Sequence, residues 1–447
     1  MTKQTMHIGL DDTDSTRRGC TTYIAALLVE KLQKLGANFI DYPNLIRLNP
    51  NVPWKTRGNG ALCLRIQHDE NAEEKIKETT TTTLEEHSDL AFKGTDPGIV
   101  FLARASIPKE VKVFAKNTIT SVSSLKEALT LIKKFKAEAV GFKNGRGIIG
   151  ALAAIGETLQ GDYTYEILAY RVPENYGLKR QVDEASIFEM DKATVPYTFN
   201  NVDSEKNRII IMPRGPDPIL FGVRGETPEV VKKAFAMVKP LEPVERCVIF
   251  RTNQGTDAHL KRIKTLCEIK PYHPLIIKGT VATPPRIIPR RHVIFSIKDE
   301  SAQVDCAAYE PTGALERVAQ KLVVGDYVEA YGGVRASSRN RPLTINLEKI
   351  RLLRPAPRIV YRNPVCPECG KRLESMGKDK GFRCKKCGTR YANLGKDAVK
   401  MKREVSVGLY ITSTRSQRHL TKPFRRYGME KKYAKVPITP IEGWHFP

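Results

Sequence analysis

Three carboxylates stand within four positions near the start of the chain, at Asp11, Asp12 and Asp14. An apolar run precedes them, and an amphipathic stretch from Tyr23 follows, so we expect a strand that ends at the acids and then a helix. Such close carboxylates repel one another unless they share a hard cation, and Mg²⁺ prefers one or two carboxylates with phosphate oxygens. The amides at a helix start suit phosphate as well. This pattern favours a magnesium–nucleotide site over the alternative, a turn whose acids cap the helix.

Two further segments combine glycine with basic residues. The loop over residues 49–60 carries Lys55 and Arg57 between prolines and glycines, which can offer cations and backbone amides to phosphates. The segment 143–147 opens a helix of small residues whose N-terminus suits an anion. It is not a P-loop, because its lysine precedes the glycines. Without the acidic segment, an ordinary surface loop would be the preferred interpretation of the first segment, and the second is a weak motif on its own.

Four of the nine cysteines form two CxxC pairs, Cys366 with Cys369 and Cys384 with Cys387. This spacing is typical of a tetrahedral zinc site. Four sulfurs complete the coordination shell, so we expect a structural zinc ion rather than a catalytic one.

The net charge of +25 is concentrated in the C-terminal part of the chain. Residues 259–447 hold 39 Lys and Arg against 16 Asp and Glu, an excess of 23. Such an uneven distribution indicates nucleic-acid binding. In the tail, residues 396–447, the cations alternate with aromatic residues, a combination that suits unstacked RNA bases, although some aromatics should simply anchor the tail.

The chain is long enough for roughly three or four domains. Strands are expected at 163–171, 208–212, 219–224 and 246–251, with one clear helix at 228–238, which predicts a small ferredoxin-like α+β layer over residues 163–258. Five short strands, expected at 275–281, 292–297, 303–309, 327–334 and 344–352, and one helix at 314–322 match an OB-fold barrel. Arginines lie in its expected loops, at Arg286, Arg290, Arg291, Arg335, Arg339 and Arg341. We expect four domains, at residues 1–145, 146–258, 259–355 and 356–447, the last holding the zinc ribbon and the tail.

No apolar run approaches the ~18 residues of a membrane span, and the N-terminus lacks the apolar core of a signal peptide. We therefore expect a cytoplasmic protein with no membrane partner.

The motifs together resemble one family. Segments 9–14, 47–60 and 145–154 and the zinc ribbon are similar, in this order along the whole chain, to archaeal tRNA-isoleucine 2-agmatinylcytidine synthetases. The resemblance implies a multidomain α/β and all-β protein: a kinase-like α/β domain, a ferredoxin-like domain, an OB-fold and a zinc ribbon. It implies an ATP-dependent ligase that joins agmatine to the wobble cytidine of isoleucine tRNA with a CAU anticodon, and so shifts decoding from AUG to AUA.

The resemblance also implies roles for individual residues. Asp11, Asp12 and Asp14 would hold Mg²⁺ and orient ATP, and Thr21, a candidate phosphoryl acceptor, would lie with Thr22 beside the transferred group. Arg57 would act in catalysis, and Lys55 and Arg146 would join it in neutralising phosphoryl charge. Further nucleotide contacts are expected at Asn59, Lys143, Gly145 and Gly147. Agmatine is expected at loops 198–203 and 213–218, where Asp203 would pair with its guanidinium beside Asn200.

Two other classes remain open at this point. A non-catalytic RNA-binding protein, or a DNA-binding factor, would explain the OB-fold, the ribbon and the charge. Neither would explain the acidic cluster. Dependence of ATP turnover on tRNA and agmatine distinguishes the three.

Overall fold

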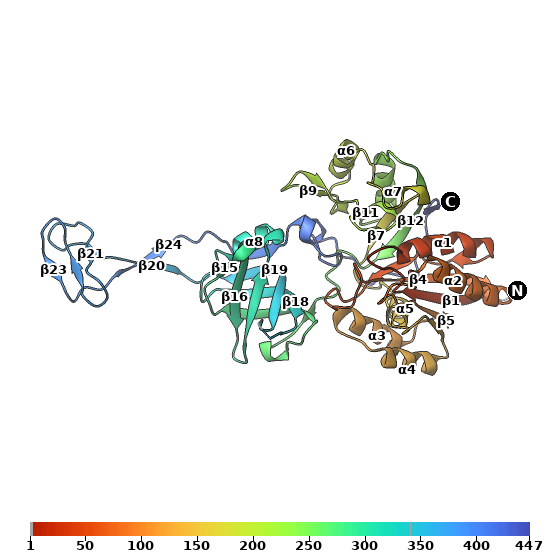
Figure 1. Cartoon of the computed structure of the whole chain (residues 1–447), viewed down its shortest axis with the longest axis horizontal. Helices are drawn as coiled ribbons and strands as arrows, with labels where there is room; N and C mark the ends of the chain where they lie inside the picture. Colours follow the sequence, from red (N-terminus) through yellow and green to blue (C-terminus); the bar gives the residue numbers. More distant parts are fainter. Residues whose placement is uncertain (1–2, 340) are drawn as a thin grey trace.

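The computed structural model describes residues 3–339 and 341–447. The first two domains lie at one end of an elongated molecule, a barrel lies in the middle, and the zinc ribbon projects at the far end (Figure 1). Within the described ranges, every helix is too short or too polar to span a bilayer.

The first domain is a sheet with helices on both faces. Apolar residues of α1 and α2 pack on one face, and those of α3, α4 and α5 pack on the other. Its strands are β1 (Lys3–Asp11), β2 (Asn38–Phe39), β3 (Asn44–Arg47), β4 (Gly60–Asp69), β5 (Gly98–Ala103) and β6 (Glu138–Gly141). Its helices are α1 (Thr21–Lys34), α2 (Glu73–His87), α3 (Lys109–Thr120), α4 (Leu125–Phe135) and α5 (Gly147–Gly156).

The second domain adds more strands to the same sheet. Its elements are β7 (Thr164–Arg171), α6 (Glu184–Thr194), β8 (Thr198–Phe199), β9 (Val202–Asp203), β10 (Arg208–Ile209), β11 (Ile219–Gly225), α7 (Pro228–Met237) and β12 (Val244–Thr252). Strand β12 runs parallel to β3, with Arg251 opposite Asn44, so one sheet continues through both domains. The junction between the domains is therefore held by main-chain hydrogen bonds as well as by side-chain packing.

Two expectations for this domain were wrong. The strand expected over 208–212 is only two residues long and pairs with β9 in a separate ribbon. Beyond it the Ile210 amide donates to the carbonyl of Asn201, and the segment then turns away into the proline-rich loop 213–218. Helix α6 was not expected, although its buried residues Ser186, Ile187, Met190 and Thr194 follow helical spacing.

The third domain is the expected OB-fold barrel. Strand β14 pairs with both β18 and β16, which closes the barrel, and α8 lies between β17 and β18 in the chain. The elements are β13 (Lys261–Arg262), β14 (Pro274–Val281), β15 (Arg286–Ile288), β16 (His292–Lys298), β17 (Gln303–Ala308), α8 (Ala314–Ala319), β18 (Tyr327–Arg335) and β19 (Thr344–Arg354).

A two-stranded arm, β20 (Arg358–Arg362) with β24 (Asp397–Met401), leads from the barrel to the ribbon (Figure 1). The ribbon is a three-stranded sheet of β21 (Glu374–Ser375), β22 (Phe382–Arg383) and β23 (Arg390–Tyr391). Its small core is formed by Leu373 and Phe382 around the cysteines.

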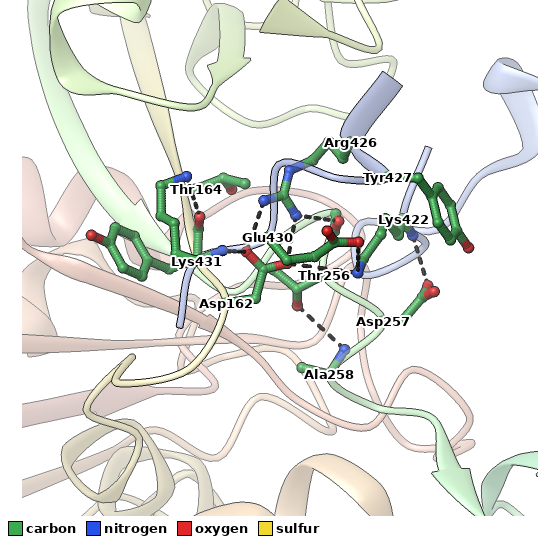
Figure 2. A network of polar contacts seen from close by, with 12 residues as sticks. Asp162, Thr164, Thr256, Asp257, Ala258, Lys422, Arg426, Tyr427, Glu430 and Lys431 are labelled. Carbon is green, nitrogen blue, oxygen red and sulfur yellow. Dashed lines mark hydrogen bonds and ion pairs between the residues drawn. The ribbon is translucent and has the colours of Figure 1, made fainter. Parts of the chain in front are cut away.

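The tail returns from the ribbon to the other three domains. Strand β25 (Gly408–Ile411) pairs with β19 of the barrel, and β26 (His445–Phe446) pairs with β12. The composition of the tail predicts contacts with RNA, whereas many of its cations contact acidic residues of the second domain and its surroundings. Figure 2 shows this network around Arg426, whose fully buried guanidinium pairs with Asp162.

A second buried contact joins the tail to the barrel. Glu348 of β19 accepts a hydrogen bond from Thr421 at 2.8 Å and contacts His259 at 3.1 Å. Burial raises the pKa of Glu348, but His259, the nearby Arg418 and the Thr421 hydroxyl outweigh it and bring the pKa down to about 2. Glu348 is therefore a charged anchor for the tail.

Candidate active site

The three acids lie where β1 ends, and Asp11 is the deepest. Burial, then the charge of Asp12, raise the pKa of the Asp11 carboxyl well above its usual range. Helix α5 lies directly against this carboxylate: a Cβ at Gly150 would overlap Asp11 Oδ2. Glycine at this position therefore lets the helix and the acid share the space.

Asp12 adopts a left-handed backbone conformation, with φ of 60°. This turns its carboxylate towards Arg146, which donates from Nη2 at 2.7 Å and from Nε at 3.0 Å. Burial nevertheless raises the pKa of Asp12 to about 6, against the effect of Arg146. A further cation beside Asp11 and Asp12 would stabilise the charged forms of both carboxylates.

Asp14 belongs to a chain of charges that joins the first two domains. Arg57 donates from Nε to Asp14 at 2.6 Å and from Nη1 to Asp217 at 3.2 Å. Its Nη2 donates to the Gly19 carbonyl at 2.6 Å. The sequence predicted a role for loop 213–218 but not for Asp217 itself. Arg57 therefore links the acidic cluster to that loop.

Helix α1 begins beside the acids. Its N-cap residue, Cys20, provides no side-chain hydrogen bond to the first turn, and that turn holds no acidic residue. Thr21 and Thr22 are its first residues, and the hydroxyls of Thr13 and Thr21 are 3.0 Å apart. The uncapped amides are therefore available to an anion in the cavity.

These groups line one cavity of about 340 Å³ between the first two domains. Nine predicted site residues line it, namely Asp11, Asp12, Asp14, Thr21, Thr22, Lys55, Arg57, Asn59 and Arg146. Three other predicted contacts do not. Lys143 donates instead to the carbonyls of Phe92 at 2.7 Å and Thr95 at 2.8 Å. Gly145 lies in the turn before α5, and Gly147 is the first residue of the helix, where a Cβ would clash with the Gly98 amide nitrogen.

A second cavity of about 430 Å³ lies beside the first and shares part of its wall. Asn200 lines it, as does His419 of the tail, which lines both cavities. Asp203 lines neither cavity. Its buried carboxylate pairs with Arg415 at 3.1 Å, so it is not free for a ligand's guanidinium.

The four ribbon cysteines bring their sulfur atoms within 4.8 Å of one another. Tetrahedral zinc with Zn–S bonds of about 2.3 Å requires sulfurs this close, so the set fits the expected structural zinc ion. Among the described residues this is the only group of three or more potential ligands that converges so tightly. Asp11, Asp12 and Asp14 do not converge, because Arg146 and Arg57 hold two of them.

An acidic, arginine-lined cavity joined to an OB-fold barrel and a zinc ribbon places the protein in the class of nucleotide-dependent RNA-modifying enzymes. Family models agree domain by domain. The TiaS TCKD domain matches residues 7–144, the TiaS FLD domain 145–259, an OB-fold nucleic acid binding domain 276–353, and the TiaS C-terminal zinc ribbon domain 363–405.

Relatives agree over nearly the whole length. The isoleucine-tRNA 2-agmatinylcytidine synthetase TiaS of Methanocaldococcus jannaschii is 42% identical over 94% of this chain and 98% of its own. The protein of the same name from Methanosarcina mazei is 42% identical over 94% and 97%. A crystal structure of TiaS in complex with isoleucine tRNA and ATP superposes with a TM-score of 0.85 at 39% identity, covering 95% of this chain and 97% of that one. The chain belongs to the TiaS family of isoleucine-tRNA 2-agmatinylcytidine synthetases.

The predicted family and the four predicted folds are therefore confirmed, and the non-catalytic alternatives are set aside. A crystal structure of TiaS with isoleucine tRNA, AMPCPP and agmatine has a TM-score of 0.83 at 37% identity, over 95% of this chain and 97% of that one. That complex contains agmatine and an ATP analogue, in line with the two small substrates expected from the sequence.

Proposed function

We propose that this protein uses ATP to form 2-agmatinylcytidine at the wobble cytidine of isoleucine tRNA with a CAU anticodon. The observation that carries the proposal is the cavity in which three carboxylates, two arginines and a helix N-terminus meet. Membership of the synthetase family and the names of its relatives support the same activity.

The residues of the cavity suit the triphosphate of ATP. Asp11 and Asp12 would hold Mg²⁺, which would screen the phosphates and polarise the group being transferred. Arg57, Arg146 and Lys55 neutralise charge that develops on the phosphoryl group, and the amides of Thr21 and Thr22 donate to its oxygens. The predicted role of Thr21 as a phosphoryl acceptor fits its position in the cavity wall.

The chemistry requires activation of cytosine, because its 2-carbonyl oxygen is a poor leaving group. Transfer of a phosphoryl group to this oxygen makes a leaving group, and the primary amine of agmatine then attacks C2. The new C–N bond forms, the C2–O bond breaks, phosphate departs and the amine loses a proton. Transfer of one phosphoryl group from ATP leaves ADP, so release of AMP also requires water to cleave the bond between the α- and β-phosphates. AMP and two phosphates are then the expected by-products.

Asp217 is the best partner for agmatine's guanidinium. It lines the first cavity from loop 213–218 and is 9% exposed. Its Oδ2 pairs with Arg57 at 3.2 Å, whereas its Oδ1, 3.5 Å from Arg180 Nη2, has no hydrogen bond and can accept one from agmatine. Asp203, the partner expected from the sequence, lines neither cavity, and its carboxylate faces Arg415 of the tail. We assign agmatine to the end of the first cavity near Asp217, where its amine can reach a cytosine that faces the acids.

The C-terminal half would position the tRNA. Basic loops of the barrel and the cations of the ribbon contact phosphates, which give affinity but little sequence information. Reaction at the carbonyl requires an unpaired, unstacked cytosine, so the wobble base should flip into the cavity. Selectivity then depends on the body of the tRNA, and the modification changes decoding from AUG to AUA.

The substitution Asp12→Asn tests the site. Transfer of labelled agmatine should fall by about 100-fold or more, since charge at the reacting phosphate is no longer organised. Affinity for tRNA should stay within about twofold, because most phosphate contacts lie in the C-terminal half. Glu174→Gln, at an exposed position outside both cavities, is the matched control. Full activity of Asp12→Asn would show that the acids only form a capped turn.

A comparison of two substrates tests recognition. We expect agmatine transfer to isoleucine tRNA with a CAU anticodon and almost none to methionine tRNA with the same anticodon. Equal modification of both would refute recognition through the tRNA body.

A further inference from the structure

The second cavity has a strongly basic wall. Its lining includes one carboxylate, that of Glu166, and five arginines: Arg47, Arg208, Arg214, Arg224 and Arg415. Agmatine carries two positive charges, so this cavity repels the substrate that its neighbour accepts. Its charge instead suits an anion.

Three of the five guanidiniums lack a carboxylate partner. Arg224 pairs with Glu166 at 2.8 Å, and Arg415 pairs with Asp203 and Glu205 at 3.1 and 3.2 Å. Over residues 3–339 and 341–447, Arg47, Arg208 and Arg214 have no carboxylate oxygen within 4.0 Å. The cavity therefore keeps uncompensated positive charge.

Arg47 is the most informative of these residues because it lies where the two cavities meet. Its Nε is buried without a hydrogen-bond partner, and burial lowers the pKa of its guanidinium to about 10. A Cβ at Gly58 or Gly60 would lie 2.7 or 2.8 Å from its Nη1, so both glycines leave room for the guanidinium. An enclosed cation with no counter-charge is costly unless a ligand supplies one.

His419 adds a neutral donor to this cluster. Arg224 Nη2 donates to His419 Nδ1 at 3.1 Å, and a guanidinium can only donate, so the ring hydrogen lies on Nε2. Burial and the charges of Arg47 and Arg224 lower the pKa of His419 well below its usual range. The ring therefore stays neutral and can donate a hydrogen bond to an anion without accepting a proton from it.

The network in Figure 2 keeps this wall in place. Thr414, Arg415, Gln417 and His419 of the tail line the second cavity, and the residues that follow, from Lys422 to Lys431, anchor the tail through buried ion pairs. The basic wall is thus built from three parts of the chain and fixed by contacts that do not depend on a ligand.

We propose that the second cavity is a phosphate-binding site next to the reaction centre. Arginines bind phosphate oxygens through paired, charge-assisted hydrogen bonds, and five of them surround one space here. The source of the phosphate rests on the proposed function: it is either phosphate or pyrophosphate released from ATP, or a phosphodiester of the bound tRNA beside the flipped cytidine. The two sources share one chemistry, and the experiment separates them.

The probe for the first source is inorganic pyrophosphate, titrated calorimetrically into the full-length protein with a non-hydrolysable ATP analogue filling the first cavity. Pyrophosphate should bind once per chain. The variant Arg208→Gln/Arg214→Gln should weaken this binding by about tenfold or more, as expected for lost charge-assisted hydrogen bonds. Both positions are exposed and lie outside the first cavity, so fold and ATP binding should persist. Lys126→Gln/Lys133→Gln, at exposed positions on α4 outside both cavities, removes the same charge elsewhere.

The probe for the second source is isoleucine tRNA with a CAU anticodon, bound to the same variants over a range of salt concentrations. A phosphodiester in the cavity predicts weaker binding by Arg208→Gln/Arg214→Gln and a salt dependence shallower by about one contact per lost arginine. Either effect, absent from the control variant, supports the site. If the variant binds both pyrophosphate and tRNA like the control, or loses affinity for agmatine instead, the proposal is wrong. These are binding measurements, so they stand even if wild-type protein failed to transfer agmatine, which would refute only the proposed function.

Discussion

Substitution of Arg426 by methionine should release the tail. The buried guanidinium donates to Asp162 at 2.9 Å, to Glu226 at 2.5 Å and to the Gly255 carbonyl at 2.6 Å. Removing one partner of a buried ion pair costs about 3–5 kcal/mol, because the other charge is left uncompensated. Lys431 remains 2.7 Å from Glu226, so we expect the lower end, about 3 kcal/mol. The equilibrium for tail docking should then fall by roughly two orders of magnitude.

The assay uses tryptophan fluorescence during urea unfolding. The chain has two tryptophans, and Trp444, 8% exposed, packs against Phe39 in the tail's docked position. In a Trp54→Phe background, Trp444 alone reports docking. With a slope of about 2 kcal/mol per molar urea, the midpoint of its transition should fall by about 1.5 M.

The neighbouring residue provides the control for this experiment. Arg425 pairs with Asp191 at 3.0 Å but its side chain is 40% exposed, and exposed pairs contribute about 1 kcal/mol or less. Arg425→Met should therefore shift the midpoint much less. Equal shifts in the two variants would refute the reasoning. Adding Asp162→Asn to Arg426→Met should recover part of the loss, because Glu226 keeps Lys431 as its partner and no buried carboxylate is then left uncompensated.

Three further outcomes are expected. Gly150→Ala should abolish agmatine transfer and destabilise the protein by up to about 2 kcal/mol, because overpacking against Asp11 outweighs the improved helix propensity. Gly161 has open space around it, so Gly161→Ala should retain both activity and stability in the same assays. Cys384→Ser should lose zinc by metal analysis and weaken tRNA binding, while ATP binding at the other end of the molecule persists; intact zinc content would contradict the assignment. The pKa of Glu348 is depressed in the folded protein, so its contribution to stability is complete above about pH 4.5 and is lost as pH falls towards 2. The urea midpoint of the wild-type protein should therefore fall over this pH range, and Glu348→Gln should make that fall smaller. An equal fall in both proteins would refute the role of Glu348.

Elements with strong local patterns were predictable from the sequence. The barrel strands alternate apolar and polar residues, so β14, β16 and β18 begin and end within about two residues of their expected bounds. The cysteine spacing predicted a cluster that the structure contains. The acids and the 49–60 loop were predicted to share a site because the family resemblance gives Lys55 and Arg57 a role beside the acidic segment, and they line one cavity.

Long-range pairings were not predictable in this way. The parallel contact of β3 with β12 joins residues about 200 positions apart, and neither strand carries a local mark of its partner. The same holds for the tail. Its cations suggested RNA, but Arg415 and Arg426 pair with Asp203 and Asp162, which composition alone cannot match.

The site was predicted incompletely for the same reason. Asp203 was preferred for agmatine because it is an acid in a loop, and only its contact with Arg415 shows that it is occupied. Asp217 and His419 enter the cavities from segments whose sequence offers no motif, a proline-rich loop and the tail. Lys143 was placed with the nucleotide because it is a cation beside glycines, yet its ammonium bonds to two carbonyls that hold a turn.

The returning tail also sets an order on biosynthesis. Domains fold largely as units, N-terminal first, while the chain is being made. A nascent chain that has reached the ribbon can already hold the acids, the barrel and the zinc cluster, but not Arg415, His419 or the anchor at Arg426. The tail's part of the wall between the two cavities is thus added after the acids, the barrel and the zinc cluster. Incomplete chains that bind tRNA would lack this wall, and so the binding half of the protein matures before its chemistry does.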